Sequence, residues 1–273
     1  MKIIKKLTWI IKRHPYLYYI RFKLLSRNGS VNQVEAYSYN AINKKQALPN
    51  NFNEVNLEIF KNFSKTSDLD KTIQLSKWLR LHIKGGSGLS LSSAKALDKM
   101  LKGEGGVCSD VSQVFNNFCV LNDIEVKEWG LTSFPYDIEF GGHAFNEVYV
   151  KELKKWVLID VSKTVLFYKD GYSEPLSVLE VFELNKSSEK IYYKSFFESN
   201  DIESDLINDY FLNPKRVPFL ICNYNNQTYD KYLDRYQGVL PIFMIHFWLY
   251  ITRRSYYYLF PLHDSKSNFS YNR

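Results

Sequence analysis

Cysteine is scarce in this chain of 273 residues, which contains only three. Three cysteines cannot build a disulfide framework, and an odd number is typical of proteins kept in a reducing compartment. No apolar run reaches the roughly 18 residues that a membrane-spanning helix needs. The apolar stretch 7–11 is too short for a signal peptide, and Lys12 and Arg13 end it. We therefore expect a cytoplasmic protein.

Acidic residues are absent before Glu35, so the net charge of +7 is unevenly distributed. The first 34 residues hold eight cations: Lys2, Lys5, Lys6, Lys12, Arg13, Arg21, Lys23 and Arg27. Apolar residues at positions 3, 7, 10 and 11 follow helical spacing and predict an amphipathic helix. This helix either packs on the main domain or docks residues 1–27 on an anionic membrane surface. No nucleic-acid partner is expected, because no binding motif accompanies the charge.

Periodicity predicts the main elements of the chain. Helices are expected over 67–83, over 92–101 and from Cys108 to about Leu121, and Ser177 with Glu180 forms a capping box that opens another. A strand near 126–132 and a hairpin over 143–150 and 155–160 should follow the cysteine helix. The Asn- and Lys-rich stretch 40–66 is interpreted as a loop or loose connector. The apolar segment 239–251 is too short to span a bilayer and forms either a buried or an interfacial helix.

Three short motifs carry residue types that work together in catalysis. They are Gly-Gly-Val-Cys-Ser-Asp at 105–110, Gly-Gly-His-Ala-Phe-Asn-Glu-Val at 141–148 and Trp-Val-Leu-Ile-Asp at 156–160. A thiol needs a neighbouring base to become a thiolate, and an imidazole needs a third group to orient it. Cys108, His143 and Asp160 are therefore the candidate nucleophile, base and orienting carboxylate.

The expected elements give these three residues suitable positions. Cys108 would begin a helix, where the helix dipole and unpaired N–H groups favour thiolate. If the hairpin turn centres between residues 151 and 152, His143 lies directly opposite Asp160, within reach of a hydrogen bond. Cys119 is interpreted as a small buried apolar residue, and Asp110 as a first-turn acid that stabilises the helix dipole. Asn146 and Glu147 are assigned packing or supporting roles.

These motifs resemble the transglutaminase-like superfamily, in its bacterial single-domain form, over about residues 69–185. The resemblance implies an α+β, papain-like fold, with a cysteine-bearing helix packed on an antiparallel sheet that carries His143 and Asp160. It implies a thioester mechanism on a protein, peptide or small amide. The stretch 88–93 lacks the tryptophan that animal members use for the oxyanion, and Asp160 is not followed by proline. These departures favour another amide reaction over protein cross-linking.

No cofactor is implied, and no cluster of cysteine, histidine and carboxylate residues has metal-ligand spacing. The chain is divided into a basic arm (1–34), a catalytic domain (35–200, core 67–185) and an aromatic C-terminal extension (201–273). The predicted function is cysteine-dependent acyl transfer or hydrolysis at an amide or ester carbonyl. Two alternatives stay open: a cysteine peptidase or amidase of the same fold, and a non-catalytic membrane-associated scaffold.

Overall fold

The computed structural model of the chain describes residues 15–137, 139–197 and 203–265. The amphipathic helix predicted around residues 3–11 lies outside them. Helices and short helical turns occur throughout: α2 Pro15–Leu25, α3 Val31–Glu35, α4 Tyr39–Ile42, η1 Lys45–Ala47, α5 Asn50–Phe60, α6 Asp68–His82, α7 Ser93–Leu101, α8 Cys108–Leu121, α9 Val178–Lys186, α10 Ser204–Ile207, the π-helical turn η2 Asn208–Leu212, α11 Asn226–Tyr236 and α12 Ile242–Ile251.

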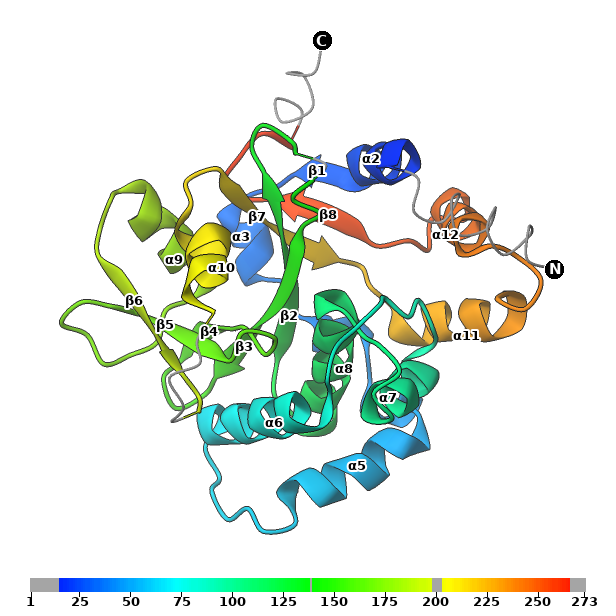
Figure 1. Cartoon of the computed structure of the whole chain (residues 1–273), viewed down its shortest axis with the longest axis horizontal. Coiled ribbons are helices and arrows are strands. Elements are labelled where there is room, and N and C mark those ends of the chain that lie inside the picture. The colour runs from blue at the N-terminus through cyan, green and yellow to red at the C-terminus, as the bar shows by residue number, and fades with distance from the viewer. Residues whose placement is uncertain (1–14, 138, 198–202, 266–273) are drawn as a thin grey trace.

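A six-stranded sheet runs through the centre of the molecule in the order β1-β8-β7-β2-β3-β4 (Figure 1). Its strands are β1 Ser26–Asn28, β2 Val126–Ser133, β3 His143–Val150, β4 Lys155–Ile159, β7 Arg216–Cys222 and β8 Tyr257–Phe260. Only β1 and β8 pair in parallel; the other neighbours are antiparallel. A second sheet pairs β5 (Val165–Lys169) with β6 (Ile191–Ser195). The class is therefore α+β with a mainly antiparallel sheet, as the sequence predicts.

Both faces of the large sheet are covered, and β4 illustrates how its residues divide between them. Successive side chains of a strand point to opposite faces. Val157 and Ile159 pack into a core shared with α5, α6, α7 and α8, whereas Leu158 joins a second core with α9, η2 and the small sheet. Burial on both sides explains why these strands read as nearly continuous apolar runs.

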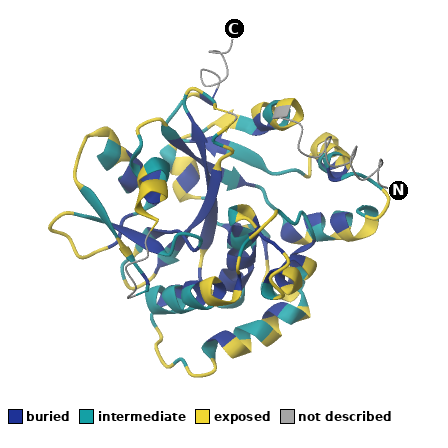
Figure 2. Ribbon diagram, viewed as in Figure 1, coloured by how far each residue is buried: buried dark blue, intermediate teal, exposed yellow. Residues whose placement is uncertain are grey.

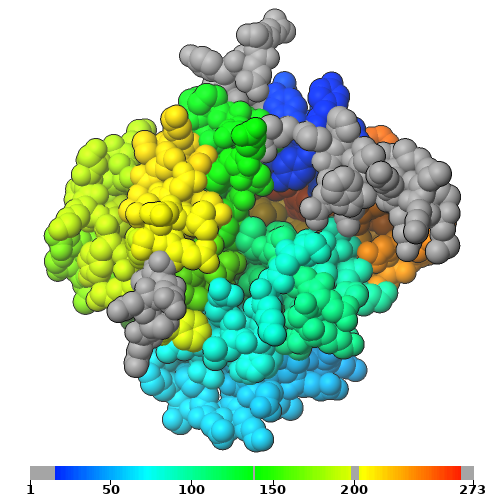
Figure 3. All heavy atoms as spheres, viewed as in Figure 1, coloured from blue at the N-terminus to red at the C-terminus, as the bar shows by residue number. Residues whose placement is uncertain are grey.

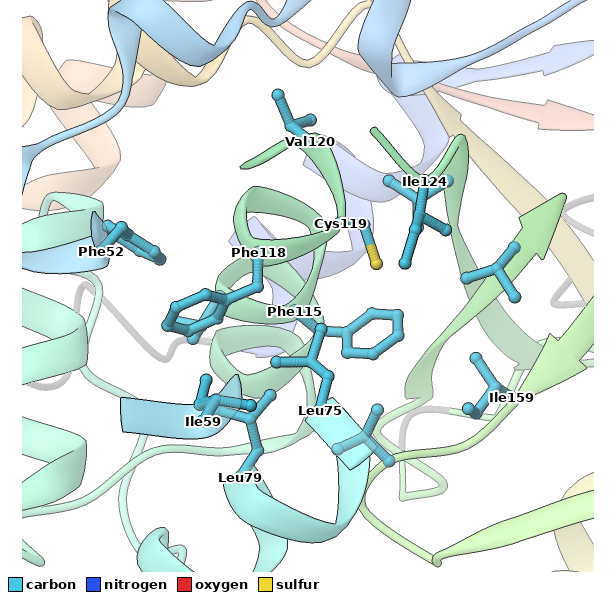
Figure 4. Close-up of a cluster of buried hydrophobic side chains, with 14 of the residues drawn as sticks. Phe52, Ile59, Leu75, Leu79, Phe115, Phe118, Cys119, Val120, Ile124 and Ile159 are labelled. Carbon is cyan, nitrogen blue, oxygen red and sulfur yellow. The ribbon is translucent and has the colours of Figure 1, made fainter. Parts of the chain in front are cut away.

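Helix α8 spans the residues predicted from its periodicity and lies deep in the first core. Val114, Phe115 and Phe118 are at most 1% exposed, and Cys119 is fully buried among them (Figure 4). Figure 2 shows β2 as buried along its length and α8 as largely buried. The helix that begins with Cys108 is thus held by apolar packing over its full length.

Capping side chains begin α6 and α9 where the sequence predicts. Ser67 Oγ accepts a hydrogen bond from the Asp70 N–H at 3.0 Å. At α9, Ser177 Oγ accepts from the Glu180 N–H at 3.2 Å, and the Glu180 carboxylate accepts from the Ser177 N–H at 2.6 Å. Such caps satisfy backbone donors that a helix leaves unpaired.

The predicted register of the β3–β4 hairpin is wrong by two residues. Val150 pairs with Lys155 and Asn146 with Ile159, so the turn centres between residues 152 and 153. Four residues, 151–154, form the turn, and the last, Lys154, has φ +51°. Each residue of β3 therefore faces the residue two places further along than expected. Because side chains alternate with period two, the shift leaves every residue on its predicted face.

Residues 40–66 contain more structure than their polar composition suggests, which corrects the loop interpretation. Helix α5 occupies residues 50–60 and buries Phe52 and Ile59, each at most 2% exposed. These two side chains are seven residues apart, close to two helical turns, so they lie on one face and pack on the α8 core.

The C-terminal segment 201–273 contributes two strands to the large sheet. Strand β7 pairs with β2 from Trp129↔Leu220 to Ser133↔Arg216, and β8 pairs with β7. Within the arm 1–34, β1 pairs with β8. Segments predicted as an arm and an extension therefore share one sheet with the central segment, while the division into domains stays a prediction.

We expect Phe118→Ala to destabilise the protein by about 3–5 kcal/mol, because it removes a fully buried ring and leaves a cavity. Urea unfolding followed by circular dichroism measures the change. The control is Leu57→Ala on α5, where the side chain is 75% exposed and the expected change is within about 0.5 kcal/mol. Equal changes in the two variants would contradict the core described here.

Candidate active site

Cys108, His143 and Asp160 come together at one end of the neighbouring strands β3 and β4. Cys108 is the first residue of α8, His143 is the first residue of β3, and Asp160 follows the last residue of β4. Cys108 and His143 line the same cleft of about 340 Å³, and His143 is close enough to Cys108 to lower the pKa of its thiol. The three residues that the sequence analysis selected are therefore neighbours in the structure.

A buried pair forms between His143 and Asp160. The His143 Nε2–H donates to Asp160 Oδ2 at 2.6 Å, and the two side chains are 4% and 0% exposed. The other carboxylate oxygen, Oδ1, accepts the backbone N–H of Lys163 at 3.0 Å. Since Nε2 is occupied by Asp160, Nδ1 is the ring nitrogen left for the thiol. In the observed register Asp160 lies diagonally across from His143 and not directly opposite it. The imidazole ring is long enough to bridge this greater distance between the two backbones.

The surroundings of the thiol favour its charged form. Burial on its own raises the pKa of Cys108, but the hydrogen bond and charge of His143, with the Ala144 N–H, lower that pKa below its ordinary value. Burial also opposes the charged imidazole, yet the charge and hydrogen bond of Asp160 and the contact with Cys108 raise the pKa of His143 to about 9. Each charged form therefore favours the other, a thiolate on Cys108 and an imidazolium on His143.

Two glycines and Asp110 shape the turn that delivers Cys108. Gly105 and Gly106 have φ of +131° and +117°, and a Cβ on Gly105 would lie 2.7 Å from the Ser87 carbonyl oxygen. Asp110 Oδ2 accepts the N–H of Val107 at 3.0 Å and that of Leu89 at 3.1 Å. The first-turn acid predicted for the helix dipole therefore also ties the 85–89 loop to the start of α8.

Tyr210 belongs to the site, although no motif in the sequence pointed to it. Its ring stacks on His143 with centroids 4.3 Å apart and planes 19° apart. Tyr210 lies on η2, while Phe211 beside it is buried against Phe145. The stacked ring restricts the rotation of the imidazole. Its only sequence signal was an aromatic residue in a polar stretch, which is common in this chain.

Asn146 and Glu147 have the supporting roles that the sequence analysis assigned. Asn146 Nδ2 donates to Asn116 Oδ1 at 2.8 Å and thereby joins β3 to α8. Glu147 accepts from Trp129 Nε1 at 3.1 Å and from the Val178 N–H at 2.9 Å on the opposite face. Both side chains are buried away from the thiol, so their contribution is to hold β3 in place.

The cleft around Cys108 is open to solvent and is lined by both positively and negatively charged side chains. Its walls come from the end of α6, the glycine turn, the start of β3, the turn 161–163 and η2. Arg80 and Lys163 supply positive charge, and Glu203 is ion-paired to Lys163. A larger hollow of about 600 Å³ lies against α7 and α11 and is lined by none of the three candidate residues. Among residues that the structure describes, no group of three or more His, Cys, Asp or Glu side chains could hold a metal.

Comparison with known proteins adds little to this geometry. No protein-family model and no curated protein matches the chain. Among solved structures, a Cytophaga hutchinsonii protein described as a "putative cysteine protease" matches with a TM-score of 0.33 and 20% identity. The match covers 42% of this chain and 37% of that one. A likeness this slight carries no argument about fold or activity, so the function has to be argued from the site itself.

We expect Tyr210→Ala to slow alkylation of Cys108 by about 3–10-fold, because the imidazole loses a stacked neighbour and gains rotational freedom. Tyr210→Phe keeps the ring and should react at close to the unsubstituted rate. The measurement is the rate of iodoacetamide labelling at pH 7, resolved by peptide mass spectrometry. If the phenylalanine variant is as slow as the alanine variant, the hydroxyl rather than the stacked ring is responsible.

Proposed function

We propose that the chain is a cysteine-dependent enzyme that acts on an amide or ester carbonyl through a thioester. The observation that carries the proposal is the buried His143–Asp160 bond of 2.6 Å beside a thiol at a helix N-terminus. A structural histidine can also donate to a carboxylate, but here His143 in addition lowers the pKa of the neighbouring Cys108 thiol. A lowered thiol pKa at an open cleft is typical of a nucleophile.

Acylation follows from the charged pair. The Cys108 thiolate attacks the carbonyl carbon, a C–S bond forms, and the oxygen becomes an oxyanion. The backbone N–H of Cys108, which has no partner within α8, is one donor for that oxyanion. Imidazolium His143 then gives its Nδ1 proton to the leaving nitrogen or oxygen, and the bond from that atom to the carbonyl carbon breaks. Asp160 keeps the ring oriented through Nε2.

Deacylation restores the starting state. Water or an amine attacks the thioester, and neutral His143 takes the proton of the attacking atom. The C–S bond breaks, and its electrons return to sulfur, so the thiolate–imidazolium pair is regenerated. The acceptor therefore decides between hydrolysis and acyl transfer, and Cys108, His143 and Asp160 act alike in both.

The family proposed for this chemistry is the transglutaminase-like superfamily with a papain-like fold. The three motifs support it by their order, and the arrangement of α8 against β3 and β4 is the one that the resemblance implies. Protein cross-linking is the less favoured reaction, because the sequence lacks the upstream tryptophan of animal members. A peptidase or amidase differs only in substrate and acceptor.

The test is product analysis with glutamine-containing peptides, with and without hydroxylamine as acceptor. Transfer gives a hydroxamate at the side chain, hydrolysis of the side chain gives glutamate, and a peptidase gives shorter peptides. Cys108→Ala should abolish all three. An active Cys108→Ala variant would refute the cysteine mechanism. Absence of any product, together with ordinary thiol reactivity at Cys108, would favour the non-catalytic scaffold.

A further inference from the structure

Helix α12 is apolar except for the half-buried His246, yet only one side of it is buried. Its ten residues, Ile242–Ile251, include no Asp, Glu, Lys or Arg. Ile242, Ile245 and Leu249 pack against Tyr229 and Leu233 of α11. The sequence analysis expected either a buried or an interfacial helix in segment 239–251. One side of α12 is buried, and the other side has the character of an interfacial helix.

The opposite side of α12 is exposed to solvent (Figure 2). We call it the α12 face, and it consists of Met244 (44% exposed), Phe247 (64%), Trp248 (55%), Tyr250 (40%) and Ile251 (56%). Large side chains exposed together on one helix are uncommon on a monomeric protein and mark an interaction surface. Val239, 83% exposed, extends the apolar surface in front of the helix.

Positive charge adjoins the α12 face. Arg253 and Arg254 directly follow the helix and are exposed, and residues 238–263 contain no acid. Arg21 of α2 is hydrogen-bonded to Tyr256, which packs on the α12 core. Helix α2 and helix α12 therefore lie on the same side of the molecule (Figure 1 and Figure 3).

We propose that the α12 face docks on an anionic lipid bilayer at the level of the headgroups. A helix of ten residues is about 15 Å long and lies in the interface without spanning it. Within the part of the chain that the structure describes, no helix has the length and apolarity to cross a membrane. Tryptophan and tyrosine concentrate at the membrane–water boundary, and flanking arginines reach lipid phosphates.

The charge of the chain favours a bilayer over a second copy of the chain as the partner of the α12 face. The net charge of +7 repels another copy and attracts an anionic leaflet. The basic arm supplies the long-range attraction, and the α12 face supplies the apolar insertion. This inference rests on the α12 face and the basic arm, and it is independent of the proposed chemistry at Cys108.

The test is co-sedimentation of the full chain with vesicles of phosphatidylcholine alone and of phosphatidylcholine with phosphatidylglycerol. We expect binding to the anionic vesicles only, and weaker binding at high salt. The double variant Phe247→Ser/Trp248→Ser should bind at least about tenfold more weakly. The matched control is Leu57→Ser/Leu81→Ser, which alters side chains that are 75% and 69% exposed elsewhere and should bind normally.

A second readout uses the folded, unsubstituted chain and does not depend on the stability of a variant. Brominated lipid should quench the fluorescence of Trp248, identified by difference from the Trp248→Phe chain. Three results would overturn the proposal: no binding of the unsubstituted chain to anionic vesicles, no quenching of Trp248 in the bound state, or a dimer in solution that Phe247→Ser/Trp248→Ser separates. The last result would make the α12 face a contact between two copies.

Discussion

Cys108 should react with iodoacetamide at pH 6 at least about 100-fold faster than Cys119 or Cys222. Imidazolium His143 lowers the pKa of the Cys108 thiol, whereas burial raises the pKa of Cys119 and raises that of Cys222 to about 12. At a given pH Cys108 therefore holds a larger fraction of thiolate than Cys119 or Cys222. The measurement is the labelling rate of each cysteine by peptide mass spectrometry from pH 4 to 10.

The shape of the pH profile distinguishes a thiol with a lowered pKa from a thiol that is merely accessible to the reagent. The labelling rate of an activated Cys108 should fall with decreasing pH at a midpoint below the ordinary thiol pKa. Above about pH 9 His143 loses its proton, so the rate should rise again toward that of a free thiolate. A rate that climbs tenfold per pH unit up to about 8.5, as an ordinary thiol does, would contradict activation. Labelling in urea is the control, because all three cysteines should then react alike.

Replacement of Asp160 by asparagine should strongly slow the alkylation of Cys108. In Asp160→Asn the carboxylate charge that raises the pKa of His143 is lost, so this pKa should fall from about 9 toward the ordinary value. The imidazole is then neutral at pH 7, and the thiol pKa rises because its cationic partner is gone. We expect alkylation of Cys108 at pH 6 to slow by about 10–100-fold, and the midpoint of its pH profile to move upward.

The matched control is Asp123→Asn, which removes an exposed acid whose side chain is 74% accessible and paired with Lys45 on the surface. Its pH profile should coincide with that of the unsubstituted chain. Titration of the His143 ring by NMR checks the cause directly. A His143 pKa that stays near 9 in Asp160→Asn would show that another group holds the imidazolium, and the orienting role of Asp160 would be withdrawn.

Elements with local signals were predicted well from the sequence. Helix α8 begins and ends at the predicted residues because its apolar positions repeat every three or four residues, and Ser67 and Ser177 mark helix starts by caps a few residues long. The faces of His143 and Asp160 were also correct, since a register shift of two residues leaves every side chain on the same face. The candidate site could be assembled because its motifs lie on such elements.

Features that depend on distant contacts were not predictable in this way. The hairpin register depends on a four-residue turn whose last residue has positive φ, and Lys154 gives no sign of this. Tyr210 reaches His143 from 67 places along the chain, through a π-helical turn, with no spacing rule to connect them. The pairing of β7 with β2 joins segments that are about 90 residues apart in sequence.

Trapping of the acyl-enzyme tests the central claim most directly. The chain is mixed with p-nitrophenyl acetate at pH 7, quenched in acid and analysed by intact and peptide mass spectrometry. The account predicts one acetyl group per chain, on Cys108, removed by neutral hydroxylamine as a thioester is, and formed far more slowly in His143→Ala. Acetylation spread over lysines with Cys108 unmodified, or equal rates with and without His143, would contradict it.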